Sequence, residues 1–371
     1  MTSGSRQHLG HIRSLDGLRG IAVILVLLRH LHIFDRDNAL TGVSPLDHFF
    51  RGGYLGVDIF FVLSGFLITS LLLNEQEAHN KIYLLRFYGR RFLRLLPALT
   101  VLLLLYSIIT VLDGESFSAI SPGIFASFFY YLNWQYVYSF PQSFGDLGYL
   151  WSLSIEEQFY IIWPAALILL TKATRSAAIK ILFIALVVAL VMWHRHSLWT
   201  APSDVPYKLI TVFVRTDARI DSLLIGCIAA FVYRHNLIST KICRSLALVG
   251  VVVLLAHIQL TKPYTNYMFN GGFTIVALSV AFIVLGLTDS NFFLSKVLSH
   301  RFIVVIGKTS YGIYLWHYPI IKFIERNFAT ADKLFQVLLA LIVTAIFTAT
   351  SWLIIEAPAL GLKKRLFSVA S

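Results

Sequence analysis

The sequence predicts an all-α fold, a polytopic membrane bundle of about ten transmembrane helices. Of its 371 residues, 57% are hydrophobic and only 13% are charged, whereas soluble domains are about a quarter charged. The mean hydropathy is +0.73. The apolar residues also gather in runs close to the roughly 20 residues that a helix needs to cross a bilayer.

We find ten such runs within a single domain that covers residues 1–371. In the first run, a basic start followed by an apolar stretch resembles a signal peptide, but no small-residue cleavage site follows, so we expect an uncleaved helix. The runs are centred on residues 15–34, 54–73, 95–112, 152–170, 179–193, 219–233, 246–260, 273–287, 303–323 and 334–355.

Lysine and arginine are distributed unevenly between the connections. The long loop 113–150 contains neither, whereas the connection 74–94 contains one lysine and four arginines. Cytoplasmic loops are enriched in these residues, so we place both termini in the cytoplasm and expect a multi-pass protein of the cell inner membrane. The net charge of +12 comes without a nucleic-acid recognition motif, so we expect membrane lipid and no nucleic acid as a partner.

The first run carries ionisable residues at a depth where they are costly. Arg19 and His30 are eleven residues apart, which places them within about 20° of one helix face. Asp16 lies at the cytoplasmic end of the same run. Charged groups inside a membrane usually face a protein interior or a water-filled cavity and serve a function. Interfacial snorkelling is the alternative, plausible mainly for Arg29 and His32.

Carboxylates lie in the second and fourth runs. Asp58 needs a partner, for which we expect a histidine or an arginine of the first run. Glu156 and Glu157 begin the fourth run, and adjacent helical residues point about 100° apart, so we expect only one of them to face a pocket. A carboxylic acid in a dry pocket suits proton transfer.

The sixth and ninth runs carry further polar residues. Arg219 and Asp221 lie at the outer start of the sixth run. In the ninth run, Ser310 and His317 are seven residues apart and within about 20° of one face, and Tyr311 lies beside Ser310. Catalysis and simple packing are equally open for His317.

An aromatic segment, "FFYYLNWQYVYSFPQSFGDLGYLW", lies at residues 128–151 of the outer connection. Tyrosine and tryptophan are typical of the membrane interface, so anchoring is the first interpretation. Stacking on sugar faces is the alternative. For Arg215 and Asp217, before the sixth run, we favour an interfacial ion pair.

Together the runs hold histidine, carboxylate and arginine, a combination typical of proton transfer. Cys227 and Cys243 lack metal-type spacing, and His30 and His32 lie on different helix faces, so we predict no metal site. A proton-coupled glycan transporter is an alternative, although the sequence shows no interrupted helices in matching halves. A membrane scaffold would explain none of the buried charges.

Six segments, in this order along the chain, carry a resemblance to a known family. They are "LDGLRGIAVILVLLRH", "GVDIFFVLSGFLIT", "FYGRRFLRLLP", "WSLSIEEQFYIIWP", "ARIDSLLIG" and "SYGIYLWHYP", spread over residues 15–319. The chain thereby resembles the acyltransferase-3 family of integral membrane acyltransferases. The resemblance implies about ten transmembrane helices and transfer of an acyl group, usually acetyl, from cytoplasmic acyl-CoA to a carbohydrate hydroxyl.

The acceptor implied by the resemblance is a cell-surface glycan or glycolipid, such as lipopolysaccharide O-antigen, exopolysaccharide or peptidoglycan. Acylation of a small glycosylated metabolite such as a macrolide is an alternative. Some family members carry a C-terminal esterase-like domain, which we expect this chain to lack. Two possibilities stay open: the chain completes the transfer alone, or it hands the acyl group to a separate extracytoplasmic transferase.

The resemblance also implies roles for individual residues. The family's element of arginine, ten residues and histidine matches Arg19 and His30. We expect His30 to be a base or a transient acyl carrier, oriented by Asp58 or Glu156, and Arg19 to position the donor. His317 is a further catalytic candidate. Many members have a second histidine just before the motif histidine, where this chain has an arginine.

The arginine-rich third segment suggests the donor site. Arginine binds phosphate with a planar fork, so we expect coenzyme A, a co-substrate rather than a bound cofactor, to contact Arg90, Arg91 and Arg94. Membrane anchoring is the alternative for each of them. We expect substrate binding to involve Asp16, Arg219, Asp221, Ser310 and Tyr311.

Overall fold

The computed structural model describes residues 10–32, 50–139, 144–202 and 208–367. Over these residues the chain forms helices and their connections without a β-strand, which confirms the all-α prediction. The long helices are α1 (Arg13–Leu31), α3 (Gly56–His79), α4 (Leu84–Leu112), α7 (Trp151–Ala173), α8 (Ala177–Thr200), α10 (Thr216–Arg234), α11 (Thr240–Leu260), α12 (Phe273–Leu287), α15 (Ser310–Asn327) and α16 (Lys333–Ser351).

Shorter helices connect or extend the long ones. Their bounds are η2 (Gly53–Leu55), α5 (Phe117–Phe128), α6 (Leu132–Ser139), η3 (Gly145–Leu150), α9 (Lys208–Phe213), η4 (Met268–Gly272), α13 (Phe293–Leu298), α14 (Arg301–Lys308), η5 (Trp352–Glu356) and α17 (Ala357–Phe367). The elements η4 and η5 are π-helical turns that run directly into or out of long helices.

Seven helical stretches of the described chain are long and apolar enough to cross a membrane, and they coincide with seven of the ten predicted runs. The predicted runs 15–34, 219–233 and 303–323 are not among them. They correspond to α1, α10 and the pair α14 and α15, and α1, α10 and α15 each contain at least three charged residues. The seven stretches are Phe50–His79, Leu84–Leu112, Gly145–Ala173, Ala177–Thr200, Thr240–Leu260, Met268–Leu287 and Lys333–Leu362.

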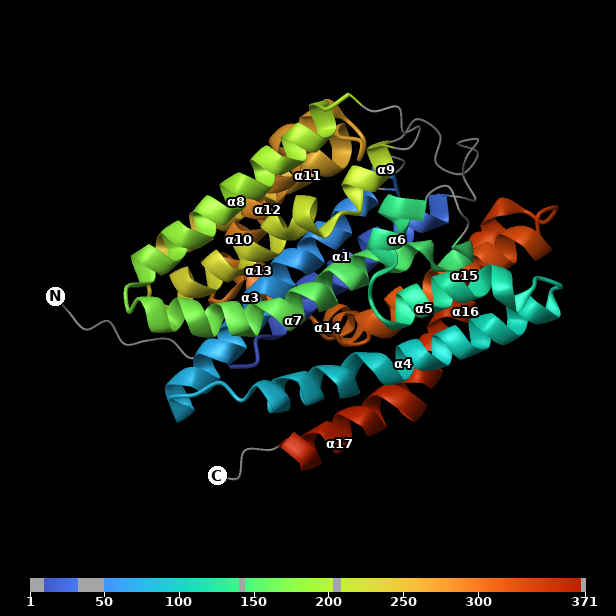
Figure 1. Ribbon diagram of the computed structural model, residues 1–371, viewed down its shortest axis with the longest axis horizontal. Helices are drawn as coiled ribbons and strands as arrows, with labels where there is room; N and C mark the ends of the chain where they lie inside the picture. The colour runs from blue at the N-terminus through green and yellow to red at the C-terminus, as the bar shows by residue number, and fades with distance from the viewer. Residues whose placement is uncertain (1–9, 33–49, 140–143, 203–207, 368–371) are drawn as a thin grey trace.

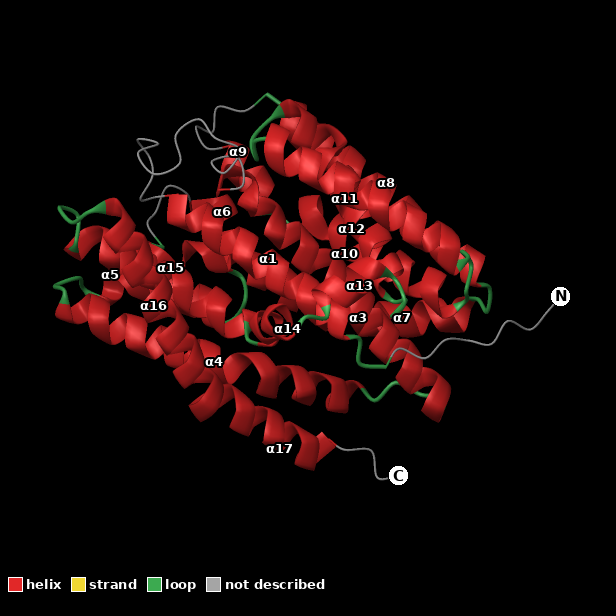
Figure 2. Ribbon diagram, turned by 180° about the vertical axis from the view of Figure 1, so that it is seen from behind, coloured by secondary structure: helices red, strands yellow, loops and turns green. Residues whose placement is uncertain are grey.

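Helix α1 lies at the centre of the bundle, where it packs against α3, α14 and α15 (Figure 1). Helix α3 packs against α10, which in turn contacts α8 and α12. At the periphery, α4 and α17 run side by side in both views (Figures 1 and 2). The central helices α1 and α10 are therefore surrounded by other helices, which shield their polar side chains from lipid.

The close approach of α3 and α10 depends on two glycines. A Cβ atom at Gly65 would overlap the backbone oxygen of Leu223, and one at Gly226 would overlap that of Val62. Small residues at such contacts let two helix backbones approach closely inside a membrane. The contact fixes α10 against α3 beside the centre of the bundle.

The ninth predicted run is not one helix. Helix α14 ends at Lys308 and α15 begins at Ser310, with Thr309 between them at φ −94° and ψ 6°. Helix α14 packs across the start of α1, where Gly307 lies against the backbone of Asp16. Helix α15 instead follows α1 toward its other end. The chain therefore has to change direction at Thr309.

The predicted loop 113–150 also differs from its prediction, because it folds into α5, α6 and η3. The side chain of Ser116 caps α5 by accepting a hydrogen bond of 3.3 Å from the backbone N–H of Ala119. These short helices lie over one end of the bundle, and η3 supplies Tyr149 to the site described next.

Candidate active site

Helices α1 and α15 bring two histidines together. Nδ1 of His30 lies 2.9 Å from Nε2 of His317, and the ring centroids are 4.9 Å apart. His317 is only 1% exposed. Its Nδ1 lies 2.7 Å from the backbone oxygen of Tyr314 and 3.0 Å from that of Ile313.

These contacts determine where the protons sit when both rings are neutral. A carbonyl oxygen only accepts hydrogen bonds, so Nδ1 of His317 carries the proton and Nε2 of His317 presents a lone pair. Nδ1 of His30 must then donate to His317. The lone pair of His30 is left on Nε2, where it is available to take a proton from a bound molecule.

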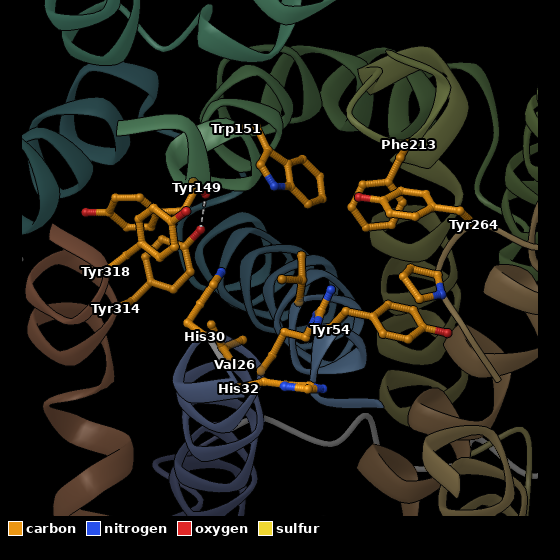
Figure 3. Close-up of a pocket in the computed structure, with 13 residues that line it drawn as sticks. Val26, His30, His32, Tyr54, Tyr149, Trp151, Phe213, Tyr264, Tyr314 and Tyr318 are labelled. Atoms are coloured by element: carbon orange, nitrogen blue, oxygen red, sulfur yellow. Dashed lines mark hydrogen bonds between the residues drawn. The ribbon is translucent and has the colours of Figure 1, made fainter. Parts of the chain in front are cut away.

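His30 lines a cavity of about 430 Å³, which we call the histidine cavity (Figure 3). Aromatic rings form most of its wall, and polar groups lie between them, as in many sites for small ligands. Tyr149, Tyr314 and Tyr318 lie on one side of the cavity, and Phe213 and Tyr264 lie on the other. The other lining residues are Val26, Arg29, His32, Tyr54, Val57, Trp151 and Pro263.

The tyrosines beside His30 are fixed by short hydrogen bonds. The hydroxyl of Tyr314 donates to the backbone oxygen of Tyr149 at 2.6 Å, and the hydroxyl of Tyr149 donates to the backbone oxygen of Leu315 at 2.5 Å. Oγ of Ser152 lies 2.6 Å from the Tyr314 hydroxyl and therefore donates to it. This side of the cavity is thus held in place by contacts between η3, α7 and α15.

A narrower space of about 60 Å³, which we call the neck, adjoins the histidine cavity. Glu156 is one of the polar groups that line it. One carboxylate oxygen of Glu156 accepts a hydrogen bond from Ser64 at 3.1 Å, and the other lies 3.2 Å from the hydroxyl of Tyr160. Ser310 and Tyr311 also line the neck. Glu156 therefore is the one of the two adjacent glutamates that faces a cavity.

A third space of about 340 Å³, which we call the arginine cavity, lies on the other side of the neck. Arg19, Arg91 and Arg94 line both spaces. The guanidinium of Arg91 lies over the ring of Tyr160 at 4.7 Å. Asp16 also lines the arginine cavity, and its carboxylate contacts Nε2 of His11 at 2.8 Å.

The three cavities adjoin one another in this order. The arginine cavity and the neck share Phe60 and Tyr160 as well as the three arginines, and the neck and the histidine cavity share Val57 and Tyr314. The row of cavities follows α1 from Arg19 to His30, a helical rise of about 16 Å.

Comparisons with known proteins decide the family. The family model described as an acyltransferase domain matches residues 12–356. The chain belongs to the acyltransferase-3 family.

Two relatives in this family have similar sequences over almost the whole chain. Peptidoglycan O-acetyltransferase OatA of Listeria monocytogenes is 34% identical over 96% of the chain, and O-acetyltransferase OatA of Staphylococcus aureus is 33% identical over 94%. The chain spans 57% of the length of each of these relatives. No solved structure matches the chain.

Most of the site residues expected for this acyltransferase-3 protein lie along the row of cavities. His317 joins the site through its contact with His30. The predicted residues that line a cavity are Asp16, Arg19, His30, Arg91, Arg94, Glu156, Ser310 and Tyr311.

Asp58 is placed differently from its prediction. Its Oδ1 accepts hydrogen bonds from Nη2 of Arg219 at 2.7 Å and from Oγ of Ser222 at 3.3 Å. The prediction of a partner from the first run is therefore wrong, because α10 and not α1 supplies the arginine. The side chain that is hydrogen-bonded to the ring of His30 is His317, and neither Asp58 nor Glu156 takes that place.

Arg219 and Asp221 belong to a buried cluster rather than to the walls of the three cavities. Asp221 accepts hydrogen bonds from Arg195 at 2.9 Å and from Thr274 at 2.6 Å, and the guanidinium of Arg219 lies 3.7 Å from the centre of the Phe273 ring. Both charged pairs, Arg195 with Asp221 and Arg219 with Asp58, have fully buried side chains. Together they connect α3, α8, α10 and α12.

Arg90 also points away from the cavities. Its Nη2 lies 3.2 Å from a carboxylate oxygen of Glu75, which is only 9% exposed. Arg90 and Arg91 are consecutive in a helix, so their side chains point about 100° apart. Only Arg91 and Arg94 of the predicted arginine group line the row of cavities.

Sequence reasoning missed the aromatic wall of the histidine cavity. Tyr149 and Trp151 lie in the aromatic segment that was interpreted mainly as an anchor, whereas Phe213 and Tyr264 come from connections without any distinctive pattern. In the described residues, no group of three or more histidine, cysteine, aspartate or glutamate side chains is arranged to hold a metal ion.

Proposed function

We propose that this acyltransferase-3 protein is a membrane O-acetyltransferase that moves an acetyl group from cytoplasmic acyl-CoA to a hydroxyl of a cell-surface glycan. The observation that carries the proposal is the row of adjoining cavities, which has arginines at one end and a positioned histidine at the other. The relatives named as O-acetyltransferases, one of them acting on peptidoglycan, support acetyl as the group and peptidoglycan as the first acceptor to test. O-antigen and exopolysaccharide are further acceptors of the same class.

The proposal includes a topology. Helices α1, α10 and α14 with α15 cross the membrane together with the seven apolar stretches, which makes about ten crossings with both termini in the cytoplasm. Helix α1 then begins at the cytoplasmic face of the inner membrane. This orientation puts the arginine cavity on the cytoplasmic side, where acyl-CoA is found, and the histidine cavity toward the opposite side.

In this orientation the donor binds first at the arginines. Arg19, Arg91 and Arg94 present guanidinium groups to the phosphates of coenzyme A, which favour planar, charge-assisted hydrogen bonds. The pantetheine arm is thin enough to extend into the neck, where Glu156 and Ser64 offer polar groups to its amides. The thioester then approaches His30, while the bulky nucleotide part of coenzyme A stays outside the neck.

At the other end, His30 acts as the base. Nε2 of His30 takes the proton of the acceptor hydroxyl, and the hydroxyl oxygen forms a bond to the thioester carbonyl carbon. The imidazolium is stabilised through its Nδ1 hydrogen bond to His317. When the carbon–sulfur bond breaks, the leaving thiolate takes the proton from Nε2, so His30 returns to its neutral form and the products are an ester and free coenzyme A.

The acceptor can also be a protein. A separate extracytoplasmic transferase that receives the acetyl group at the histidine cavity is a second form of the same proposal. The chemistry at His30 would be the same, with a hydroxyl of the partner in place of the sugar hydroxyl.

Labelled acetyl-CoA added to inverted membrane vesicles tests this proposal. We expect label to reach the glycan fraction with the wild-type protein and to be lost with His30→Ala, while Phe129→Ala, which alters an exposed residue that lines none of the three cavities, keeps normal transfer. His30→Ala protein that is folded and transfers at the normal rate would exclude the role of His30. No transfer by folded wild-type protein would favour a different donor, the partner form of the proposal, or transport.

A further inference from the structure

The short helix α6 carries an aromatic surface close to the histidine cavity. Helix α6 packs against α7, α9 and η3, and these are the elements that supply Trp151, Phe213 and Tyr149 to the cavity wall. On α6, the rings of Trp134 and Tyr138 are stacked, with centroids 6.2 Å apart and planes within 20°. Tyr138 is 78% exposed, so its ring face is open. We call these two residues the aromatic platform.

A network of hydrogen bonds through Gln158 holds Trp134 of the platform in place. The indole N–H of Trp134 donates to the side-chain oxygen of Gln158 at 3.1 Å. The amide nitrogen of Gln158 in turn donates to Asn133 at 2.9 Å and to the backbone oxygen of Tyr130 at 2.8 Å. A binding surface that is already ordered loses little entropy when a ligand binds.

Charged groups lie against Trp134 of the platform. The guanidinium of Arg215 lies over the Trp134 ring at 5.3 Å and binds Asp217 through Nε at 2.9 Å and Nη2 at 2.7 Å. Nε2 of His194 lies 3.1 Å from the same carboxylate. The side chains of Asp217 and His194 are 37% and 39% exposed, so both are open to a ligand.

Membrane anchoring explains these features less well than sugar binding. A tryptophan that anchors a protein at the interface usually turns its N–H toward water or lipid headgroups, but the N–H of Trp134 is used inside the protein. A pyranose ring instead matches the surface directly. Its C–H face can stack on an aromatic ring, and its hydroxyls can form hydrogen bonds with a carboxylate or an imidazole such as those of Asp217 and His194.

We propose that the aromatic platform, with Asp217 and His194 at its edge, binds one sugar of an oligosaccharide chain while a neighbouring sugar of the same chain enters the histidine cavity. This inference rests on the proposed function, because it assumes a glycan acceptor. It assigns the recognition of an extended chain to α6 and the start of α10, separate from the residues that carry out the transfer.

Direct binding tests the platform without any acyl donor. The probe is a tetramer of N-acetylglucosamine, titrated into the full-length protein in lipid nanodiscs and followed by calorimetry. We expect Tyr138→Ala to weaken tetramer binding about tenfold, while Tyr138→Phe, which keeps the ring face, binds within about twofold of wild type. Phe129→Ala, which removes an exposed ring next to α6 outside the platform, is the matched control.

Two further measurements separate this inference from the proposed function. Monomeric N-acetylglucosamine is expected to bind Tyr138→Ala and wild type alike, because one sugar alone can occupy the histidine cavity. In the His30→Ala background, Tyr138→Ala is expected to weaken tetramer binding by the same factor as in the wild-type background, so the platform can be verified even if no acetyl transfer is found. Tetramer binding that is unchanged in Tyr138→Ala, weakened equally in Phe129→Ala, or absent from wild type would overturn the inference.

Discussion

Nδ1 of His30 on α1 lies 2.9 Å from Nε2 of His317 on α15, so two residues 287 positions apart in the chain form one hydrogen-bonded unit. His317 is held by the backbone oxygens of its own helix. Its role in our account is to fix the tautomer of His30 and to leave Nε2 of His30 free for the acceptor.

The first prediction concerns this pair. His317→Phe removes the acceptor for the Nδ1 proton of His30, and we expect the rate of acetyl transfer to fall about 100-fold. His317→Gln offers a side-chain oxygen as acceptor and is expected to recover part of the rate. Initial rates with saturating acetyl-CoA measure both. Tyr318→Phe, whose ring lies 4.7 Å from His30, controls for packing changes. Equal losses in the Phe and Gln variants would contradict the tautomer argument.

The second prediction concerns the boundary between the neck and the histidine cavity, where Val57 lines both. Val57→Trp would fill a space of about 60 Å³, so we expect transfer to fall below detection while binding of coenzyme A at the arginine cavity persists. Val57→Ala enlarges the boundary and is expected to retain acetyl transfer and to accept longer acyl donors. Both are measured with a series of acyl-CoA chain lengths. Full activity of the Trp variant would show that the acyl group does not pass Val57.

The third prediction compares two neighbouring arginines. Arg94 lines the arginine cavity and Arg90 binds Glu75 instead. A charge-assisted hydrogen bond contributes about 1.5–3 kcal/mol, so we expect Arg94→Gln to raise the KM for acetyl-CoA about tenfold or more. Arg90→Gln is expected to leave that KM unchanged and to lower the thermal stability. Steady-state kinetics and thermal unfolding distinguish the two. A larger KM effect at Arg90 than at Arg94 would place the donor elsewhere.

The fourth prediction concerns the buried pair of Asp58 and Arg219. Removing one partner of a buried ion pair costs about 3–5 kcal/mol because the other charge stays uncompensated, so we expect Asp58→Leu to lower the unfolding temperature strongly. The double variant Asp58→Leu with Arg219→Met is expected to regain much of that stability. Thermal unfolding in detergent follows both. A stable but inactive Asp58→Leu protein would instead point to a direct role in the reaction.

Much of the site was predictable because it depends on local periodicity. The spacing of Arg19 and His30 in one helix places both on the face along which the cavities lie, and the same rule indicated that only one of Glu156 and Glu157 faces a cavity. The all-α fold follows from the long apolar runs alone.

The contacts between distant segments could not be predicted in the same way. The arginine that pairs with Asp58 is Arg219 on α10, 161 residues away. Nothing in the sequence of either helix specifies this pairing rather than a pairing of Asp58 with a residue of α1. The break at Thr309 has no proline or glycine at the break itself to signal it in the sequence. It comes from the way α14 and α15 pack on different parts of α1. The aromatic wall is likewise assembled from five separate parts of the chain, around Tyr54, Tyr149, Phe213, Tyr264 and Tyr314.

The measurement that tests the central claim most directly is the sidedness of transfer. The protein is reconstituted in one orientation into sealed liposomes, with labelled acetyl-CoA on the side of the arginine cavity and the glycan acceptor only on the side of the histidine cavity. We predict that label crosses to the acceptor with wild-type protein and with Val57→Ala, and does not cross with Val57→Trp or His30→Ala. Product that forms only when donor and acceptor share one side would contradict a transfer path along α1.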